Sequence, residues 1–201
     1  MAVDQRSVYR LRITLRDVDP AVWRVIEVLG DTTLRTLHRI LQAAMGWENR
    51  HLHVFKVGSV LYGEPDPDFD LDITNQRGVR LSQIAFAGKE RFTYEYDFGD
   101  RWMHDVVVEA VEAPDVEFTY PRFVDGQSAC PPEDVGGPPG YEAFLESFND
   151  PTHEDHRELV RWIGGRFSPH VVDVEAIEVA FARLAAAGSL KKRTRRKGDR
   201  H

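Results

Sequence analysis

Residues 91–111, RFTYEYDFGDRWMHDVVVEAV, contain two strand-like runs on either side of a short segment with glycine and aspartate. Residues 91–98 and 102–111 are rich in aromatic and β-branched residues, which favour strands. Gly99 between them can supply the positive φ that a hairpin turn often requires, while Asp97 and Asp100 can accept hydrogen bonds from turn amides. The pattern predicts an antiparallel hairpin.

Two further hairpins are predicted before this one. Residues 8–17, VYRLRITLRD, alternate polar and apolar side chains, and residues 22–29 follow after the turn Asp17-Val18-Asp19-Pro20. Residues 51–57, HLHVFKV, form a third strand-like run, with residues 59–62 as its hairpin partner. Strands therefore dominate the first two-thirds of the chain.

Helical patterns occur once early and repeatedly near the end. Asp31-Thr32-Thr33 can cap a helix over residues 34–45, where apolar residues recur at intervals of three and four, and Gly46 can end it. Later helices are predicted over residues 139–149, 153–165 and 172–188, and one helical turn over 81–85. Residues 63–80 and 113–139 are expected to be irregular. The result is an α+β fold, an antiparallel β-sheet built from hairpins and packed by an early helix and a C-terminal group of helices.

Composition and charge suggest one domain with a basic tail. The 201 residues are 42% hydrophobic and 29% charged, as in globular proteins. The net charge of −7 conceals residues 191–201, which hold seven of the 26 basic residues and one of the 33 acidic ones. We therefore expect a single α+β domain over 1–188 and a disordered basic tail over 189–201. No apolar run is long enough to span a membrane and no signal peptide is recognisable, so the expected location is cytoplasmic.

Short motifs for known chemistry are incomplete. Asp97-Phe98-Gly99 matches a kinase magnesium motif, but the chain lacks the other kinase motifs. The acidic run 64–72 resembles a calcium loop, yet Leu71 stands where such a loop needs glycine and Arg77 where it needs an acid. Cys130 is the only cysteine, which rules out an intrachain disulfide.

A divalent metal site is one open possibility, although no cofactor is required by the sequence. His51 and His53 lie one residue apart and would project to the same face of a strand, with His104 as the leading third ligand. The alternative third ligands are His38, Asp97, Asp100 and Cys130. Against this interpretation, paired histidines on a strand are more often hydrogen-bonded structural groups.

Several strings in fixed order resemble the plasmid pRiA-type Orf-three-like family of proteins. These are LRDVDPAVWRVIEV, TTLRTLHRILQAAMGWENRHLHVF, LYGEPDPD, YEYDFGDRWMH and ACPPEDVGGPPGYEAFLESFNDPTHEDH, and the resemblance covers residues 7–185. It implies an α+β domain with an antiparallel sheet but no settled activity. Many family members have two cysteines in this loop, whereas here Phe123 stands at the first position and only Cys130 remains.

Family members are also labelled TnpR passenger proteins of insertion elements, which implies a bacterial mobile-element association. The label suggests a recombinase, but residues 9–14 lack the serine and the spacing of serine resolvases. The strand-rich chain also differs from the helical tyrosine recombinases. The recombinase signatures are therefore absent.

Three function classes stay open, and no membrane partner is expected. The first is a non-enzymatic interaction or binding module, whose functional surface would form where the 94–104 turn contacts the 130–137 loop. Its residues would be Asp97, Gly99, Asp100, Trp102, His104, Glu133, Asp134, Gly136, Gly137 and Tyr141. The second is a metal-dependent hydrolase or nuclease-like enzyme using His51, His53, Asp97, Asp100 and His104.

The third class is a nucleic-acid-binding accessory protein that contacts phosphates through its basic tail. The tail cations are Lys191, Lys192, Arg193, Arg195, Arg196 and Lys197. The identity of a protein or nucleic-acid partner and the oligomeric state are left open.

Overall fold

The computed structural model describes residues 7–65, 72–85, 90–165 and 167–198, with side chains described up to residue 187. Within these residues the strands are β1 (Val8–Leu15), β2 (Trp23–Leu29), β3 (His53–Val57), β4 (Val60–Gly63), β5 (Ile73–Asn75), β6 (Arg91–Tyr96), β7 (Trp102–Glu112) and β8 (Arg122–Gln127). The helices are α1 (Leu34–Met45), α2 (Leu81–Ile84), α3 (Gly137–Asn149), α4 (His156–Trp162) and α5 (Val174–Gly198). The α+β class predicted from the sequence is confirmed.

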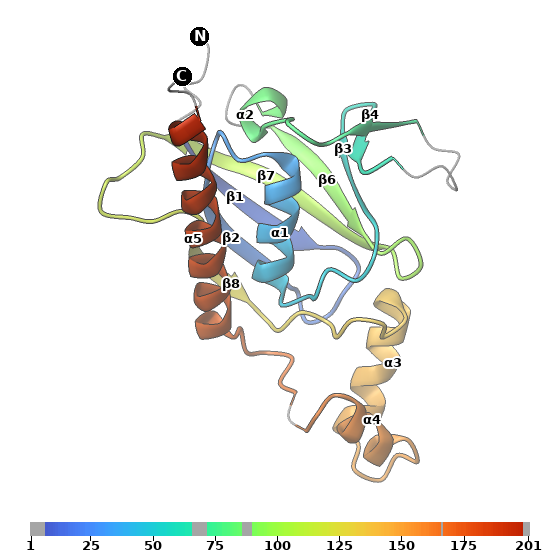
Figure 1. Cartoon of the computed structure of the whole chain (residues 1–201). Helices are drawn as coiled ribbons and strands as arrows, with labels where there is room; N and C mark the ends of the chain where they lie inside the picture. The colour runs from blue at the N-terminus through green and yellow to red at the C-terminus, as the bar shows by residue number, and fades with distance from the viewer. Residues whose placement is uncertain (1–6, 66–71, 86–89, 166, 199–201) are drawn as a thin grey trace.

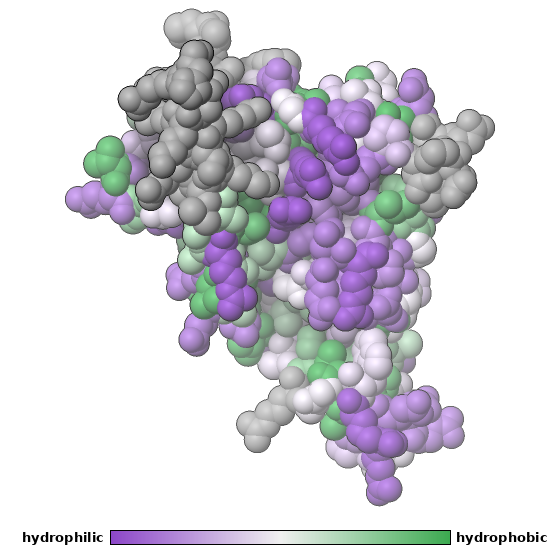
Figure 2. Space-filling view, in the orientation of Figure 1, coloured by the Kyte–Doolittle hydropathy of each residue, from purple (hydrophilic) through white to green (hydrophobic). Residues whose placement is uncertain are grey.

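All described strands belong to one sheet in the order β5-β4-β3-β6-β7-β1-β2-β8. The predicted hairpins β1–β2, β3–β4 and β6–β7 are present and antiparallel, and only the β4–β5 pair is parallel. The helices α1 and α5 cover one face of the sheet, while α3 and α4 pack together beyond one end of it (Figure 1). Figure 2 shows the same side of the molecule as mostly hydrophilic, with apolar residues in small separate groups.

The helix α1 forms where its caps and apolar spacing predict it. The Thr33 side chain accepts a hydrogen bond from the Thr36 amide at 3.2 Å, and Gly46 ends the helix with φ of 83°. Leu34, Leu37 and six further residues of the helix are buried. Burying one leucine side chain contributes about 1.5–3 kcal/mol, so this face anchors α1 to the sheet.

The turn between β6 and β7 differs from the expectation in its backbone. Gly99 does not have a positive φ; instead Asp97 and Arg101 have φ of 58° and 56°. The turn spans the five residues 97–101, and the Arg101 amide donates to the Asp97 carbonyl at 2.6 Å. The longer loop moves the left-handed positions to its two ends, so the assignment to Gly99 was wrong.

Two strands lie in segments predicted to be irregular. They are β5 within residues 63–80 and β8 within residues 113–139. Both occupy edges of the sheet. Most of the calcium-like run 64–72 lies outside the described residues.

The backbone of α5 continues to Gly198, past the end at residue 188 that the sequence predicts. The predicted boundary between domain and tail therefore falls inside α5, and the division itself stays a prediction. The helices of the described chain are each too short or too polar to cross a lipid bilayer.

Candidate functional site

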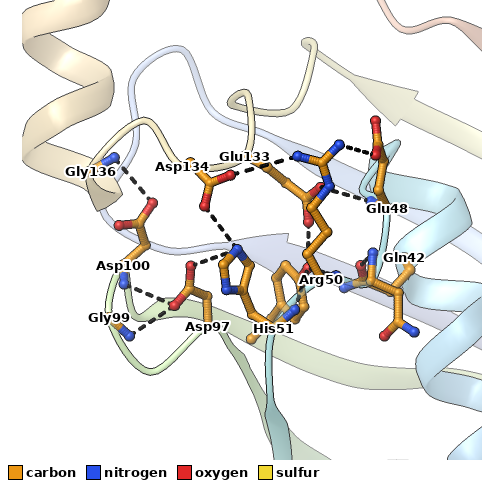
Figure 3. A network of polar contacts seen from close by, with 12 residues as sticks. Gln42, Glu48, Arg50, His51, Asp97, Gly99, Asp100, Glu133, Asp134 and Gly136 are labelled. Atoms are coloured by element: carbon orange, nitrogen blue, oxygen red, sulfur yellow. Dashed lines mark hydrogen bonds and ion pairs between the residues drawn. The ribbon is translucent and has the colours of Figure 1, made fainter.

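Three chain segments meet beside the β6–β7 turn: residues 48–51, the turn 97–101, and the loop 133–136 (Figure 3). The predicted contact between the turn and the loop is confirmed, because the Gly136 amide donates to Asp100 Oδ2 at 3.1 Å. The Asp100 carboxylate was expected to accept from turn amides, and it joins the turn to the loop instead.

Close backbone approach strengthens this junction. Gly137 has φ of 70°, and a Cβ atom at this position would lie 2.5 Å from the Asp100 carbonyl oxygen. Only glycine fits here without displacing the turn, both because of the contact and because of the left-handed backbone. Gly137 therefore has a local structural role.

The turn holds Asp97 in one orientation. Asp97 Oδ1 accepts from the amides of Gly99 at 2.9 Å and Asp100 at 3.3 Å, as the sequence predicted. The Asp97 amide itself donates to the carbonyl of Leu52 at 2.9 Å. These bonds leave the second carboxylate oxygen, Oδ2, directed towards His51 (Figure 3).

His51 lies between two carboxylates from distant segments. Its Nε2 atom is 2.9 Å from Asp134 Oδ1 and 3.5 Å from Asp97 Oδ2. One ligand atom from each of these three residues lies within 4.8 Å of the other two. The set offers one imidazole nitrogen and two carboxylate oxygens to the same point, which is a donor set that divalent cations accept.

A tyrosine anchors the segment that carries His51. The Tyr96 hydroxyl accepts from the amides of Arg50 at 3.0 Å and His51 at 3.4 Å, and it donates to Glu133 Oε1. Burial and the bond to Glu133 raise the pKa of Tyr96, so its hydroxyl stays protonated and able to donate. Glu133 Oε2 also accepts from the Glu48 amide at 3.0 Å. The same side chains thus join all three segments.

A cavity of about 190 Å³ adjoins His51. Its walls come from α1, from residues 49–53 and from the β5 region, and they include the rings of His38 and His53. These rings stack with centroids 3.5 Å apart and planes inclined by 3°. Gln76 also lines the cavity, and its Oε1 atom lies 3.1 Å from His53 Nε2.

His38 belongs to a closed ring of hydrogen bonds beneath the cavity. The Gln42 amide group donates to the Tyr94 hydroxyl at 3.0 Å, and that hydroxyl lies 2.7 Å from His38 Nδ1. His38 Nε2 contacts Asn49 Oδ1, and the Asn49 amide donates back to Gln42 Oε1 at 3.0 Å. Burial and the neighbouring His53 lower the pKa of His38 to about 3, which keeps the ring neutral.

The structure does not bring the three predicted metal-binding histidines together. Among the described residues, His51 contacts Asp97 and Asp134, whereas His53 stacks on His38 and contacts Gln76. His104 is fully buried, and its Nδ1 lies 3.1 Å from the Tyr94 carbonyl. Burial lowers the pKa of His104 to about 4.

The other predicted site residues divide into a buried and an accessible group. Trp102, His104, Gly137 and Tyr141 are buried and support the surface from within. Asp97 is buried except for a small exposed part, while Glu133 and Asp134 are more accessible. Burial raises the pKa of the Cys130 thiol to about 12, so it is a poor nucleophile at neutral pH. The side chains of the basic tail lie beyond the described ones.

Sequence reasoning missed Asn49, Tyr96 and Gln76. Asn49 has φ of 60°. Its neighbours Trp47 and His51 were considered from the sequence, but Asn49 itself was not. Gln76 stood in a stretch interpreted as a surface loop. A lone amide in such a stretch carries no pattern, so the sequence held no signal for it.

Comparisons with known proteins match most of the described chain to one family. The family model described as plasmid pRiA4b ORF-3-like protein matches residues 7–176. The uncharacterized protein y4hQ of Sinorhizobium fredii is 43% identical over 159 residues, which cover 79% of this chain and 81% of that protein. The crystal structure of a protein of unknown function, MM3350, from Methanosarcina mazei Go1 is similar with a TM-score of 0.76 and 32% identity, covering 84% of this chain and 96% of that one.

Proposed function

This chain belongs to the plasmid pRiA4b ORF-3-like family, and we propose that it is a non-enzymatic binding module that takes a divalent cation between His51, Asp97 and Asp134. The observation that carries the proposal is the convergence of these three side chains from three separate segments. A zinc ion with ligands at about 2.0–2.2 Å in tetrahedral geometry needs ligand atoms roughly 3.4 Å apart. The separations of 2.9 and 3.5 Å from His51 Nε2 are close to that value, and all three ligand atoms lie within 4.8 Å of one another.

The surrounding charges favour a cation. Glu48, Asp100 and Glu133 add carboxylates around the three ligands (Figure 3). Arg50 forms a close ion pair with Glu48 and so offsets part of this charge, whereas its contacts with Asp134 and Glu133 are long, at 3.9 and 4.0 Å. The local excess of carboxylates attracts a dication and makes a cation-free site electrostatically costly.

One imidazole and two carboxylates are ligands that suit a transition-metal ion of intermediate hardness. Imidazole suits zinc, whereas carboxylates also suit manganese. The Gly99 and Asp100 amides that hold Asp97 would act as outer supports for the ligand, which is how metal sites fix their carboxylates. We therefore take Zn²⁺ and Mn²⁺ as the test ions.

Calorimetric titration of the tag-free full chain, after chelator treatment, tests the proposal. We expect one Zn²⁺ or Mn²⁺ per chain, and at least about tenfold weaker binding in His51→Gln and in Asp134→Asn. His153→Gln is the matched control, because His153 also lies near a carboxylate, 3.8 Å from Asp155, but outside the site. Circular dichroism confirms that each variant is folded. A chain that takes up neither ion, or a His51→Gln variant with wild-type affinity, contradicts the proposal.

The other function classes stay predictions. A metal-dependent hydrolase or nuclease would use the same ion to activate water, and turnover of a phosphodiester by the ion-loaded chain would be its readout. Nucleic-acid binding through the tail would weaken steeply with salt and would vanish on deletion of residues 189–201. A mobile-element association stays a prediction that the family description supports by analogy.

A further inference from the structure

We infer that the cavity beside the cation site binds a small anion, a carboxylate or a phosphate, through the side-chain N–H of Gln76. The cavity and the proposed cation site share only His51 in their walls. The inference does not rest on the cation, and the two can fail separately.

The inference depends mainly on the buried side-chain amide of Gln76. Its side chain is fully buried, and its Oε1 atom is used by His53 Nε2. Its Nε2 atom is buried, and no group of the described residues accepts a hydrogen bond from it. Native proteins rarely leave a buried amide donor unpaired, so this group indicates a missing acceptor. The oxygen of an anion in the cavity would supply that acceptor.

The size of the cavity limits the ligand. A water molecule takes about 30 Å³ of liquid volume, so the 190 Å³ here holds roughly six non-hydrogen atoms. Typical pockets for drug-sized ligands run to about 300–1,000 Å³. Acetate and phosphate therefore fit within it.

The charges at the mouth of the cavity select a negative ligand. Arg35 and Arg39 from α1 line the cavity together with Glu64. Glu64 lies 3.8 Å from Arg35, and Arg39 has no ion pair within the described part of the chain. A guanidinium that lacks a carboxylate partner beside an unpaired amide donor suits an oxyanion, which accepts from both.

The hydrogen bonds of His38 and His53 also favour a ligand that accepts hydrogen bonds. Within the closed ring of hydrogen bonds, His38 Nδ1 accepts a hydrogen bond from the Tyr94 hydroxyl, and His38 Nε2–H donates to Asn49 Oδ1. His53 in turn directs Nε2 to Gln76 and fixes the rotation of its amide group, so that Oε1 is occupied and the N–H group is free. The protein thereby presents a donor to the ligand.

Titration of the chelator-treated full chain with sodium acetate and, separately, inorganic phosphate tests the inference. We expect saturable binding of one of them at one site per chain, and at least tenfold weaker binding in Gln76→Glu. This variant keeps the volume and the acceptor for His53 but replaces the donor by a negative oxygen. Arg39→Gln should weaken binding severalfold, while Arg157→Gln, which removes an exposed arginine of α4 outside the cavity, should leave it unchanged.

The pattern of results separates the alternatives. Binding of acetate alone identifies a carboxylate ligand, and binding of phosphate alone identifies a phosphate ligand. Absence of binding by both anions overturns the inference, as does binding that needs added Mn²⁺ and survives Gln76→Glu, because the anion would then bind the metal.

If Gln76→Glu fails to fold, the side-chain amide resonances of Gln76 in the wild type give a second measurement. They should move downfield as the bound anion accepts their hydrogen bond. Resonances that stay in place while the anion binds elsewhere overturn the assignment.

Discussion

Left-handed backbone conformations gather at the candidate site. Asn49, Asp97 and Asp134 have φ of 60°, 58° and 59°, one in each of the three converging segments. Asparagine and aspartate tolerate this region better than other side-chain-bearing residues, because their short polar side chains bond locally. Each such residue still stores strain of roughly 1 kcal/mol or more, which the surrounding contacts must hold. The site is thus maintained by its neighbours.

Gly137→Ala should destabilise the protein strongly for the same reason. Its new Cβ would meet the Asp100 carbonyl at 2.5 Å, in addition to the cost of its positive φ. Gly46→Ala is the matched control, because Gly46 has φ of 83° but no atom within 4 Å of the new Cβ. We expect Gly137→Ala to cost about 1–3 kcal/mol more than Gly46→Ala in urea unfolding. Equal losses would show that the approach of the loop to the turn contributes nothing.

At the scale of elements, the sequence predicted those strands and helices whose apolar residues recur at regular intervals. The inner strands and α1 have regular apolar spacing, so the three hairpins and the helix were located correctly. The edge strands β5 and β8 have few buried residues, and their pairing depends on neighbours far away in the sequence. The contact between the 94–104 turn and the 130–137 loop was predicted through the family resemblance, whereas the cavity came from segments that no local pattern connects.

One buried carboxylate adds to the backbone pairing that holds the edge strand β8 on the sheet, which gives a prediction at this scale. Glu27 bonds Arg10 on β1 and Arg122 on β8, each at 2.8 Å. Burial raises the pKa of Glu27, but its bonds to the two arginines outweigh this effect and the pKa is lowered. Glu27→Gln should lower the free energy of unfolding by about 1.5–3 kcal/mol, the typical range for charged hydrogen bonds.

Glu109→Gln serves as the control for Glu27→Gln. Glu109 also pairs with an arginine, Arg12 on β1, but both side chains are more than 30% exposed. Its loss should cost less than about 1 kcal/mol. Similar losses in the two variants, measured by urea unfolding, would refute the special role of Glu27.

At the scale of the whole molecule, buried neutral histidines make stability depend on pH. Burial lowers the pKa of His38 to about 3 and of His104 to about 4, from an ordinary value of 6.5. Between these values and 6.5 the unfolded chain binds protons that the folded chain does not. Stability is therefore fully present above pH 6.5 and decreases as the pH falls.

Two such groups correspond to a loss of about 2–3 kcal/mol per pH unit between pH 6 and pH 5. The ion-paired carboxylates lose their contribution to stability at lower pH than this. The pKa of Glu27 is lowered from an ordinary value of 4.5, and the pKa of Asp105 is lowered from 3.8. Urea unfolding at pH 7, 6 and 5 gives the slope. A free energy of unfolding that is the same at pH 7 and pH 5 would contradict the prediction.

The strand order also determines how long β1 in the growing chain must wait for its second partner strand. β1 pairs on one side with β2, which follows at once, and on the other side with β7, which ends at Glu112. Synthesis at about 5–20 residues per second separates the ends of β2 and β7 by roughly 4–17 s. During this interval Leu11 and Ile13, fully buried in the finished fold, stand on an unpaired strand edge of a nascent hairpin. The early hairpin therefore keeps an unpaired edge with apolar side chains until β7 has been made.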